Sequence, residues 1–97
     1  NPINIPYCNQ FIRSSSSTGA NYRAACRAKS PADFINKLKI VEEELDESVY
    51  FLELLDYFNS ESATENDIIR KEADDLLAIT VQSIKTARAK LNQSKKQ

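Results

Sequence analysis

The run from Pro31 to Phe58 constrains the fold most, because apolar side chains recur along it at alternating steps of four and three residues. That spacing places them on one stripe of a helix and is typical of a seam between packed helices. A second apolar stripe opens in the last two turns. A helix with apolar residues on two sides has more than one neighbour, so we expect a bundle that associates with copies of itself. The seam comprises Phe34, Leu38, Val41, Leu45, Ser48, Leu52 and Leu55, and the second stripe Phe51, Leu54 and Phe58.

The dipeptide Ser30-Pro31 predicts where this helix begins. The Ser30 hydroxyl can cap the first turn, and Pro31 sits where a missing N–H costs nothing. Asp33 lies near the positive end of the helix dipole. These signals predict a helix over residues 31–58.

A helix is expected on either side of this one. Residues 7–29 show apolar and small residues at three- and four-residue spacing, although the poor helix formers of residues 14–19 would by propensity form a loop. We favour a helix there, bent near Gly19. Thr64, with Asp67 three positions on, predicts the start of a helix over residues 65–91 after a polar turn. The first stripe is Tyr7, Cys8, Phe11, Ile12, Ser15, Thr18, Gly19, Tyr22, Ala25 and Cys26, and the last seam is Ile69, Ala73, Leu76, Thr80, Ile84, Ala87 and Leu91.

The ends of the chain and its length complete the domain prediction. The prolines of residues 1–6 predict a linker, and residues 92–97 a frayed tail. Ninety-seven residues make one domain, and so small a core gains from a partner subunit. No run approaches the roughly 18 apolar residues of a membrane span, so we expect a cytoplasmic protein that binds no membrane.

Residue types argue against an enzyme. The chain has no His and one Gly, which excludes imidazole chemistry and a glycine-rich phosphate loop. On one helix Cys8 and Cys26 lie about 27 Å apart, too far for a disulfide, so we expect two buried thiols. No cofactor is expected.

An acidic group is the one candidate for metal binding or acid–base chemistry. No His completes a bundle-type metal set, and most of these acids lie off the seam. A solvated, salt-bridged helix face is therefore the expected interpretation, with no metal bound. The group comprises Glu42, Glu43, Glu44, Asp46 and Glu47, with Asp74 and Asp75 on the next helix.

Charge is segregated along the chain although the net charge is −1. Residues 1–40 hold six cations and one acid, residues 41–75 thirteen acids and two cations, and residues 76–97 five cations. Several cations on one surface could bind a nucleic-acid backbone, and Arg23, Arg27 and Lys29 are close enough to share a face. Alternatively, these cations pair with the acidic middle of this or a neighbouring subunit. The candidate nucleic-acid-binding residues are Arg13, Arg23, Arg27, Lys29 and Lys37, followed along the chain by Lys39.

Three ordered motifs carry a family resemblance. They are S-x-x-G-A-N-Y-R-x-A from Ser16, S-x-x-D-F-I-x-K-L-x-I from Ser30, and E-x-x-E-S-x-Y-F-L-E-L-L from Glu44. With them the chain resembles the four-helix-bundle family of proteins encoded within intervening sequences of bacterial large-subunit (23S) ribosomal RNA genes. That resemblance implies an antiparallel up-and-down four-helix bundle, of which three long helices are present here and the first is absent.

The resemblance also implies a homo-oligomer, a pentamer as in relatives, and no catalysis. Relatives work beside the reverse transcriptases of diversity-generating retroelements and bind nucleic acid through a basic surface, which implies an accessory protein that binds RNA or DNA. The overall acidity opposes polyanion binding, so an oligomeric scaffold or protein-interaction module remains the alternative. Asn21, beside the packing stripe, is expected to bond to a backbone group or to fix the helix register. The candidate packing and oligomerisation residues are Gly19, Asn21, Tyr22, Phe51, Leu54 and Phe58.

Overall fold

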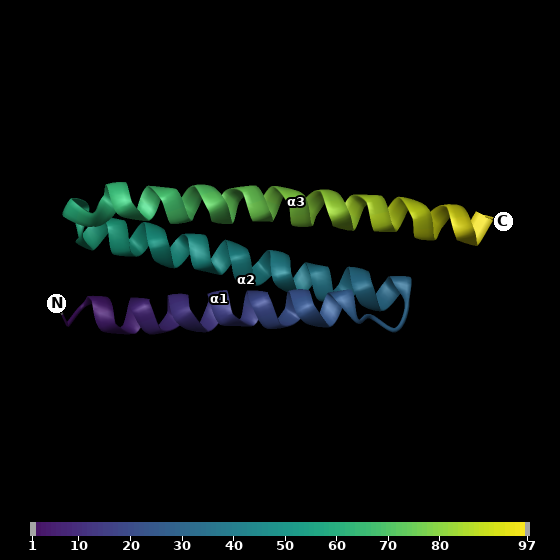
Figure 1. Cartoon of the computed structure of the whole chain (residues 1–97), viewed down its shortest axis with the longest axis horizontal. Coiled ribbons are helices and arrows are strands. Elements are labelled where there is room, and N and C mark those ends of the chain that lie inside the picture. The colour runs from purple at the N-terminus through teal and green to yellow at the C-terminus, as the bar shows by residue number, and fades with distance from the viewer. Residues whose placement is uncertain (1, 97) are drawn as a thin grey trace.

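A computed structural model describes residues 2–96, and within them the chain is all-helical with no strand. Helix α1 spans Asn4–Cys26, α2 spans Pro31–Phe58, and α3 spans Ala63–Lys96 after the short 3-10 helix η1, Ser60–Ser62. The three long helices run antiparallel in sequence order (Figure 1). The prediction of an all-α fold is confirmed. Asn1 of the expected linker and Gln97 of the expected tail lie outside the described residues.

Helix α2 begins and ends where the sequence predicts. The Ser30 Oγ accepts a hydrogen bond from the Asp33 backbone N at 3.1 Å, and Pro31 occupies the first turn. The Asp33 carboxylate in turn accepts from the Lys29 backbone N at 3.0 Å. The connection between α1 and α2 is therefore held by both side chains that the sequence singles out.

Helix α1 continues through the serine-rich run, as predicted, because the hydroxyls bond within the helix. Ser15 Oγ donates to the Phe11 carbonyl at 2.7 Å, and Thr18 Oγ1 donates to the Ser14 carbonyl at 2.8 Å. Bonds of this kind satisfy the hydroxyls without breaking the helix, although they slightly destabilise an isolated helix. Ser14 itself is fully buried and shares a 2.8 Å hydrogen bond with Ser48 of α2.

The ends of α1 lie three residues earlier than predicted at both termini. Pro6 is tolerated because it falls in the first turn, where backbone N–H groups have no helical partner. The Asn4 and Asn59 side-chain amides exchange hydrogen bonds of 2.9 and 2.7 Å, which fixes this start against the end of α2. At the other end, the Arg27 amide closes the last turn onto the Ala24 carbonyl at 3.1 Å.

Helix α3 is longer than predicted at both ends. It begins at Ala63, so Thr64 lies inside its first turn rather than before it, and it continues through residue 96 instead of fraying after residue 91. Residues 60–96 contain neither Gly nor Pro, so no residue type interrupts the helix. Asp56 of α2 holds the start of α3 against α2, because the Asp56 carboxylate accepts a hydrogen bond from the Asn66 side chain at 2.7 Å and forms an ion pair with Arg70.

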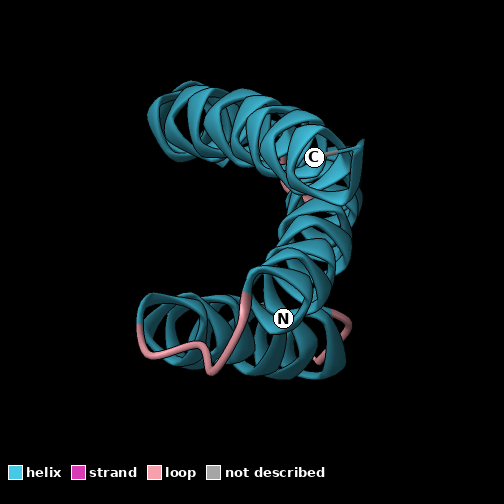
Figure 2. Ribbon diagram, turned by 90° about the vertical axis from the view of Figure 1, so that its right-hand side faces the viewer, coloured by secondary structure: helices cyan, strands magenta, loops and turns pink. Residues whose placement is uncertain are grey.

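The core lies along α2. Five of the seven buried apolar residues belong to this helix, which packs against α1 on one side and α3 on the other. Figure 2 shows α1 and α3 as two arms of an open C, and their backbones do not approach each other within the described residues. The fully buried apolar residues are Ala25, Ile35, Leu38, Val41, Leu45, Leu52 and Ile84.

Several residues assigned to seams face solvent instead. Cys8 and Cys26 are exposed, which corrects the prediction of two buried thiols. Ile69 and Leu76 of α3 are 43% and 52% exposed, although the adjoining Thr80 and Ile84 are buried. The physical reason is the open C, because side chains one step round α1 or α3 from the α2 contact meet no neighbouring helix.

Candidate nucleic-acid interface and an apolar groove

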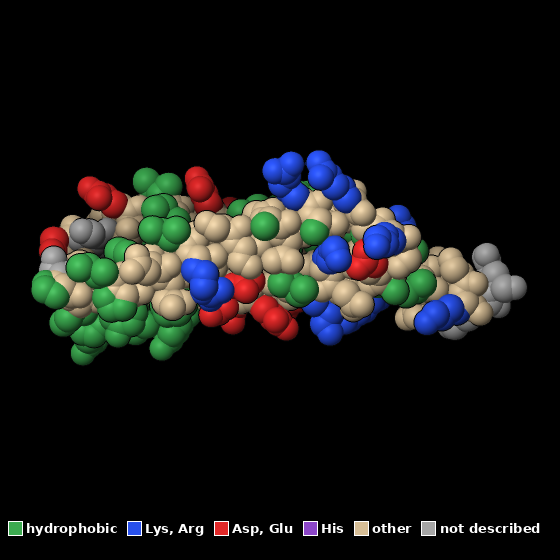
Figure 3. All heavy atoms as spheres, turned by 90° about the horizontal axis from the view of Figure 1, so that it is seen from below, with side chains coloured by type: hydrophobic (Ala, Val, Ile, Leu, Met, Phe, Trp, Pro, Cys, Tyr) green, Lys and Arg blue, Asp and Glu red, His purple; other side chains and the backbone are tan. Residues whose placement is uncertain are grey.

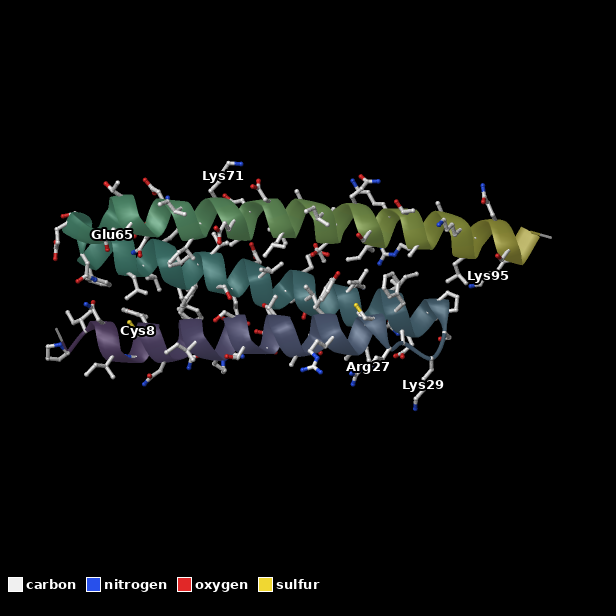
Figure 4. All side chains as sticks on the ribbon, viewed as in Figure 1. Cys8, Arg27, Lys29, Glu65, Lys71 and Lys95 are labelled. Atoms are coloured by element: carbon white, nitrogen blue, oxygen red, sulfur yellow. The ribbon has the colours of Figure 1, made fainter. Side chains whose placement is uncertain are left out.

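A basic cleft lies where α1 ends and α2 begins. Its volume is about 480 Å³, and it lies beside Ala20 and Ala24, whose short side chains leave the space open. Arg23 lies in the last turn of α1, Arg27 directly follows the helix, and Lys29 lies in the connection to α2. Figure 4 shows Arg27 and Lys29 at this end of the molecule, both pointing away from α3. We define the basic cleft by its lining, Ala20, Arg23, Ala24, Arg27, Lys29, Asp33 and Lys37.

Asp33 is the one acid in this lining, and it is already bound. Besides the Lys29 amide, its carboxylate accepts from Lys37 Nζ at 3.0 Å. The hydrogen bond from the Lys29 backbone, followed by that from Lys37, lowers the pKa of Asp33 below its ordinary value. Arg23, Arg27 and Lys29 form no side-chain ion pair in the part of the chain that the structure describes.

Arg13 is separated from this group. Its guanidinium pairs with Glu47 at 2.8 Å and Glu44 at 3.4 Å across the α1–α2 interface, and it does not line the basic cleft. Lys39 is exposed and also lies outside the lining. The structure thus brings together four of the five candidate nucleic-acid-binding residues and assigns Arg13 to pairing with the acidic middle of the chain.

Three residues of the acidic group, Glu44, Glu47 and Asp75, form ion pairs. Besides Glu44 and Glu47, Asp75 accepts from Lys71 Nζ at 2.9 Å, and this bond raises the pKa of Lys71. Among the described residues, no three His, Cys, Asp or Glu side chains are placed to hold a metal ion.

An apolar groove of about 940 Å³ opens on the other side of the α1–α2 interface. Its lining includes Phe34 of α2, Cys26 of α1 and Ile79 of α3. Lys29 and Lys90 also line it, and its described lining contains no acidic side chain. The sequence pattern missed this groove because it assigned Cys26 to the buried stripe and did not include Ile79 in the last seam.

The candidate packing residues divide into two surfaces. On α1, Tyr22 is 55% exposed, and a side chain added at Gly19 would meet nothing within 4 Å among the described residues. Asn21 instead donates to the Ser17 carbonyl at 2.9 Å, which confirms the expected backbone bond.

The second surface is an aromatic patch at the end of α2. Phe51 and Leu54 are half-buried, and Phe58 stacks on Tyr7 at a ring-centroid distance of 5.8 Å. Tyr57, which the sequence pattern did not single out, is 79% exposed. Figure 3 shows hydrophobic side chains gathered toward the end where α1 begins and most cations toward the other half.

No helix within residues 2–96 combines the length and apolar character needed to cross a membrane.

Comparison with known proteins assigns the chain to a family. Residues 5–95 match the family described as 23S rRNA-intervening sequence protein. A crystal structure of a protein of unknown function from the S23 ribosomal protein family of Bacteroides thetaiotaomicron is 37% identical, with a TM-score of 0.78. That match covers 81% of this chain and 73% of the other. No curated protein matches the sequence.

Proposed function

The chain belongs to the 23S rRNA-intervening sequence protein family, and from this membership and the basic cleft we propose that it is a non-enzymatic, self-associating bundle protein that binds nucleic-acid phosphates. The proposal rests on the cations that line the basic cleft. Arg23, Arg27 and Lys29 share one cleft without ion-pair partners among the described residues, although the whole chain has a net charge of −1.

The cleft suits a phosphate backbone rather than a single small anion. Its cations come from successive turns of α1 and from the connection to α2, so they are spread along a surface. Phosphate contacts of this kind position a protein on nucleic acid without reading its sequence. The overall acidity, which opposed polyanion binding, is offset locally because the cleft lining holds four cations and one acid.

A non-catalytic role fits the residues available. The chain has no His, and several of its carboxylates are engaged in ion pairs or in the Asp33 bonds. We also propose that a fourth helix lies in the apolar groove, completing a four-helix bundle, because exposed Cys26 and Ile79 and half-buried Phe34 line this open groove. The same open shape supports self-association, which the family resemblance implies.

Retention on immobilised RNA or DNA tests the proposal. We expect the protein to bind at low salt and Arg23→Ala/Arg27→Ala to flow through. The matched control is Lys85→Ala/Arg88→Ala, which removes two cations from exposed positions of α3 outside the cleft lining. The proposal is wrong if the wild-type protein flows through, or if the control loses as much retention as the cleft variant.

The aromatic patch favours a second candidate function. A tyrosine as exposed as Tyr57, beside half-buried Phe51 and Leu54, is typical of a protein-interaction surface. In that case the protein is a scaffold that does not touch nucleic acid. Loss of a partner protein in Tyr57→Asp, with no nucleic-acid retention in the wild type, would support it.

A further inference from the structure

We propose that the aromatic patch at the end of α2 binds a basic amphipathic helix of another protein. The apolar anchors of that helix lie across the aromatic rings, and its Lys or Arg side chains lie against neighbouring carboxylates of α2. The inference rests on the second candidate function, protein interaction, and needs no nucleic acid. It also holds whatever fills the apolar groove, because the groove lining takes from α2 only its first turn, whereas the patch lies at the other end of that helix.

The exposed tyrosines lie on the side of α2 opposite the core. Tyr57 is 79% exposed, and Tyr50, which adjoins the patch at Phe51, is 53% exposed. A helix turns by about 100° per residue, so these two tyrosines lie within about 20° of each other and about 150° from buried Leu52. A helix that completes the bundle on the core side of α2 therefore leaves both of them accessible.

The rings form two pairs whose spacing matches that of a helical ligand. Tyr50 and Phe51 are tilted against each other at a centroid distance of 5.4 Å, and Tyr57 and Phe58 meet edge to face at 5.1 Å. Seven residues separate the pairs, a rise of about 10.5 Å along α2, and half-buried Leu54 comes between them. An amphipathic helix presents apolar anchors at i, i+3 or i+4, and i+7, which spans the same rise.

The charges around the patch specify a basic partner. Residues 40–69 contain ten Asp or Glu and no Lys or Arg. Exposed Asp46 precedes Tyr50 by four residues, and exposed Glu53 lies three residues after Tyr50 and four before Tyr57, so both carboxylates adjoin the tyrosines on the helix surface. Neither forms an ion pair within residues 2–96. Figure 3 shows acidic side chains beside the hydrophobic ones in this half of the molecule.

The same features argue against other occupants. Free carboxylates beside the rings repel nucleic-acid phosphates and anionic lipid headgroups. Two copies that met patch to patch would place carboxylates against carboxylates. The basic cleft of a second copy would bring cations, but Ala20 and Ala24 are the apolar side chains of its described lining, and they are too small to bridge the two ring pairs. A basic helix with large apolar anchors supplies both the charge and the shape.

Fluorescence anisotropy with a labelled synthetic peptide and the full chain, without nucleic acid, tests the proposal. The probe is a helical peptide of about five turns with leucines at i, i+3 and i+7 and lysines or arginines on the flanks. One comparison peptide has the same composition in scrambled order, and another has Glu at each basic position. We expect the probe to bind and both comparison peptides to bind at least about tenfold more weakly.

Removing one aromatic ring locates the binding on the protein. Tyr57→Ala should weaken binding of the probe about tenfold or more, as for an aromatic interface anchor. Its α-helical circular dichroism should be unchanged, because the side chain is 79% exposed. Tyr22→Ala is the matched control, since it removes an exposed tyrosine of α1 outside the patch and should leave probe binding unchanged.

Neutralising the carboxylates tests the charge part of the proposal. Asp46→Asn/Glu53→Gln should weaken probe binding about threefold to tenfold and make it less dependent on salt. The matched control is Glu72→Gln/Asp74→Asn, which neutralises two exposed acids of α3 and should keep the wild-type affinity and salt dependence within about twofold.

The proposal is overturned if the wild-type protein binds no peptide, if the scrambled or acidic peptide binds as well as the probe, or if folded Tyr57→Ala binds like the wild type. It is also overturned if sedimentation velocity shows a wild-type assembly that Tyr57→Ala dissociates, because a second copy then occupies the patch. All of these measurements omit nucleic acid, so failure here is distinguishable from failure of the basic cleft to bind phosphates.

Discussion

The basic cleft sets how steeply nucleic-acid binding should depend on salt. Four cations line it, but Lys37 is held by Asp33 at 3.0 Å, which leaves Arg23, Arg27 and Lys29 to meet phosphates. Each phosphate neutralised on duplex DNA contributes about −0.9 to the slope of log affinity against log salt. Three contacts give a slope of about −2.7, so raising salt from about 50 to about 200 mM should weaken binding about 40-fold.

Two substitutions should move this slope in opposite directions. Arg23→Ala/Arg27→Ala leaves one unpaired cation, so the slope should fall to about −0.9 and the same salt step should cost about 3.5-fold. Asp33→Asn releases Lys37 and removes the one acid of the cleft, so the slope should steepen to about −3.6 and binding at low salt should tighten. Replacing an acid by an uncharged residue should tighten binding and steepen its salt dependence together only if Asp33 holds Lys37 in the cleft.

Fluorescence anisotropy of a labelled short duplex, titrated at several salt concentrations, measures these slopes. Lys85→Ala/Arg88→Ala is the control and should keep the wild-type slope, because both residues lie outside the cleft. The reasoning is refuted if the cleft variant keeps a slope near the wild-type value, or if Asp33→Asn flattens it while the helix content is unchanged.

Three further predictions concern stability. The Leu52 side chain is 2% exposed, so Leu52→Ala should lower the free energy of unfolding, measured by urea titration, by about 2–5 kcal/mol. A smaller loss would mean that α3 moves in to fill the cavity. Ser14→Ala should lower the free energy of unfolding by about 1 kcal/mol. A double-mutant cycle with Ser48→Ala should show that the two substitutions are coupled through the 2.8 Å hydrogen bond between these residues, and additive effects would contradict this coupling. The pKa of Asp33 is lower folded than unfolded, so its stabilisation is present above the ordinary value of 3.8 and is lost as pH falls through the folded pKa. Asp33→Asn should remove that part of the pH dependence of stability, measured by urea unfolding between about pH 2 and 6, and an unchanged profile would argue against the two hydrogen bonds.

Local signals predicted the bounds of α2 and most of its buried face, because each signal acts within one helix. Ser30 caps the amide of Asp33, as expected, and the spacing from Leu38 to Leu52 gives the buried face. The serine-rich run was harder, since propensity favoured a loop. The helix persists because it packs on α2, where Ser14 finds a buried partner, and propensity does not include this tertiary contact.

Which face of α1 and of α3 is buried could not be predicted in the same way. Three- and four-residue spacing selects a broad side of a helix, and the neighbours present decide which part of that side is buried. Cys8 and Leu76 satisfy the spacing, yet both are exposed because they lie on the open side of the C. The prediction of buried thiols therefore failed through a missing neighbour and not through a wrong helix assignment.

The candidate site was likewise predicted only in part. Arg23, Arg27 and Lys29 could be grouped from sequence, because residues four apart on a helix and the residue just after it stay close. Whether Lys37 joins them and Arg13 leaves them depends on how α1 and α2 align. That alignment appears in the Arg13–Glu47 ion pair of 2.8 Å, which pattern alone does not give. The nucleic-acid role of the group stays a prediction.

The open C links stability to assembly. Helices α1 and α3 each pack on α2 and not on each other, so neither covers the side of the other that faces the groove. A helix placed there buries apolar surface on both at once, and it does so only in the folded chain. Any such partner stabilises the native state by mass action. The unfolding midpoint of this small domain should therefore rise with protein concentration if a second copy supplies the helix, whereas a chain that fills its own groove should unfold at the same midpoint at every concentration.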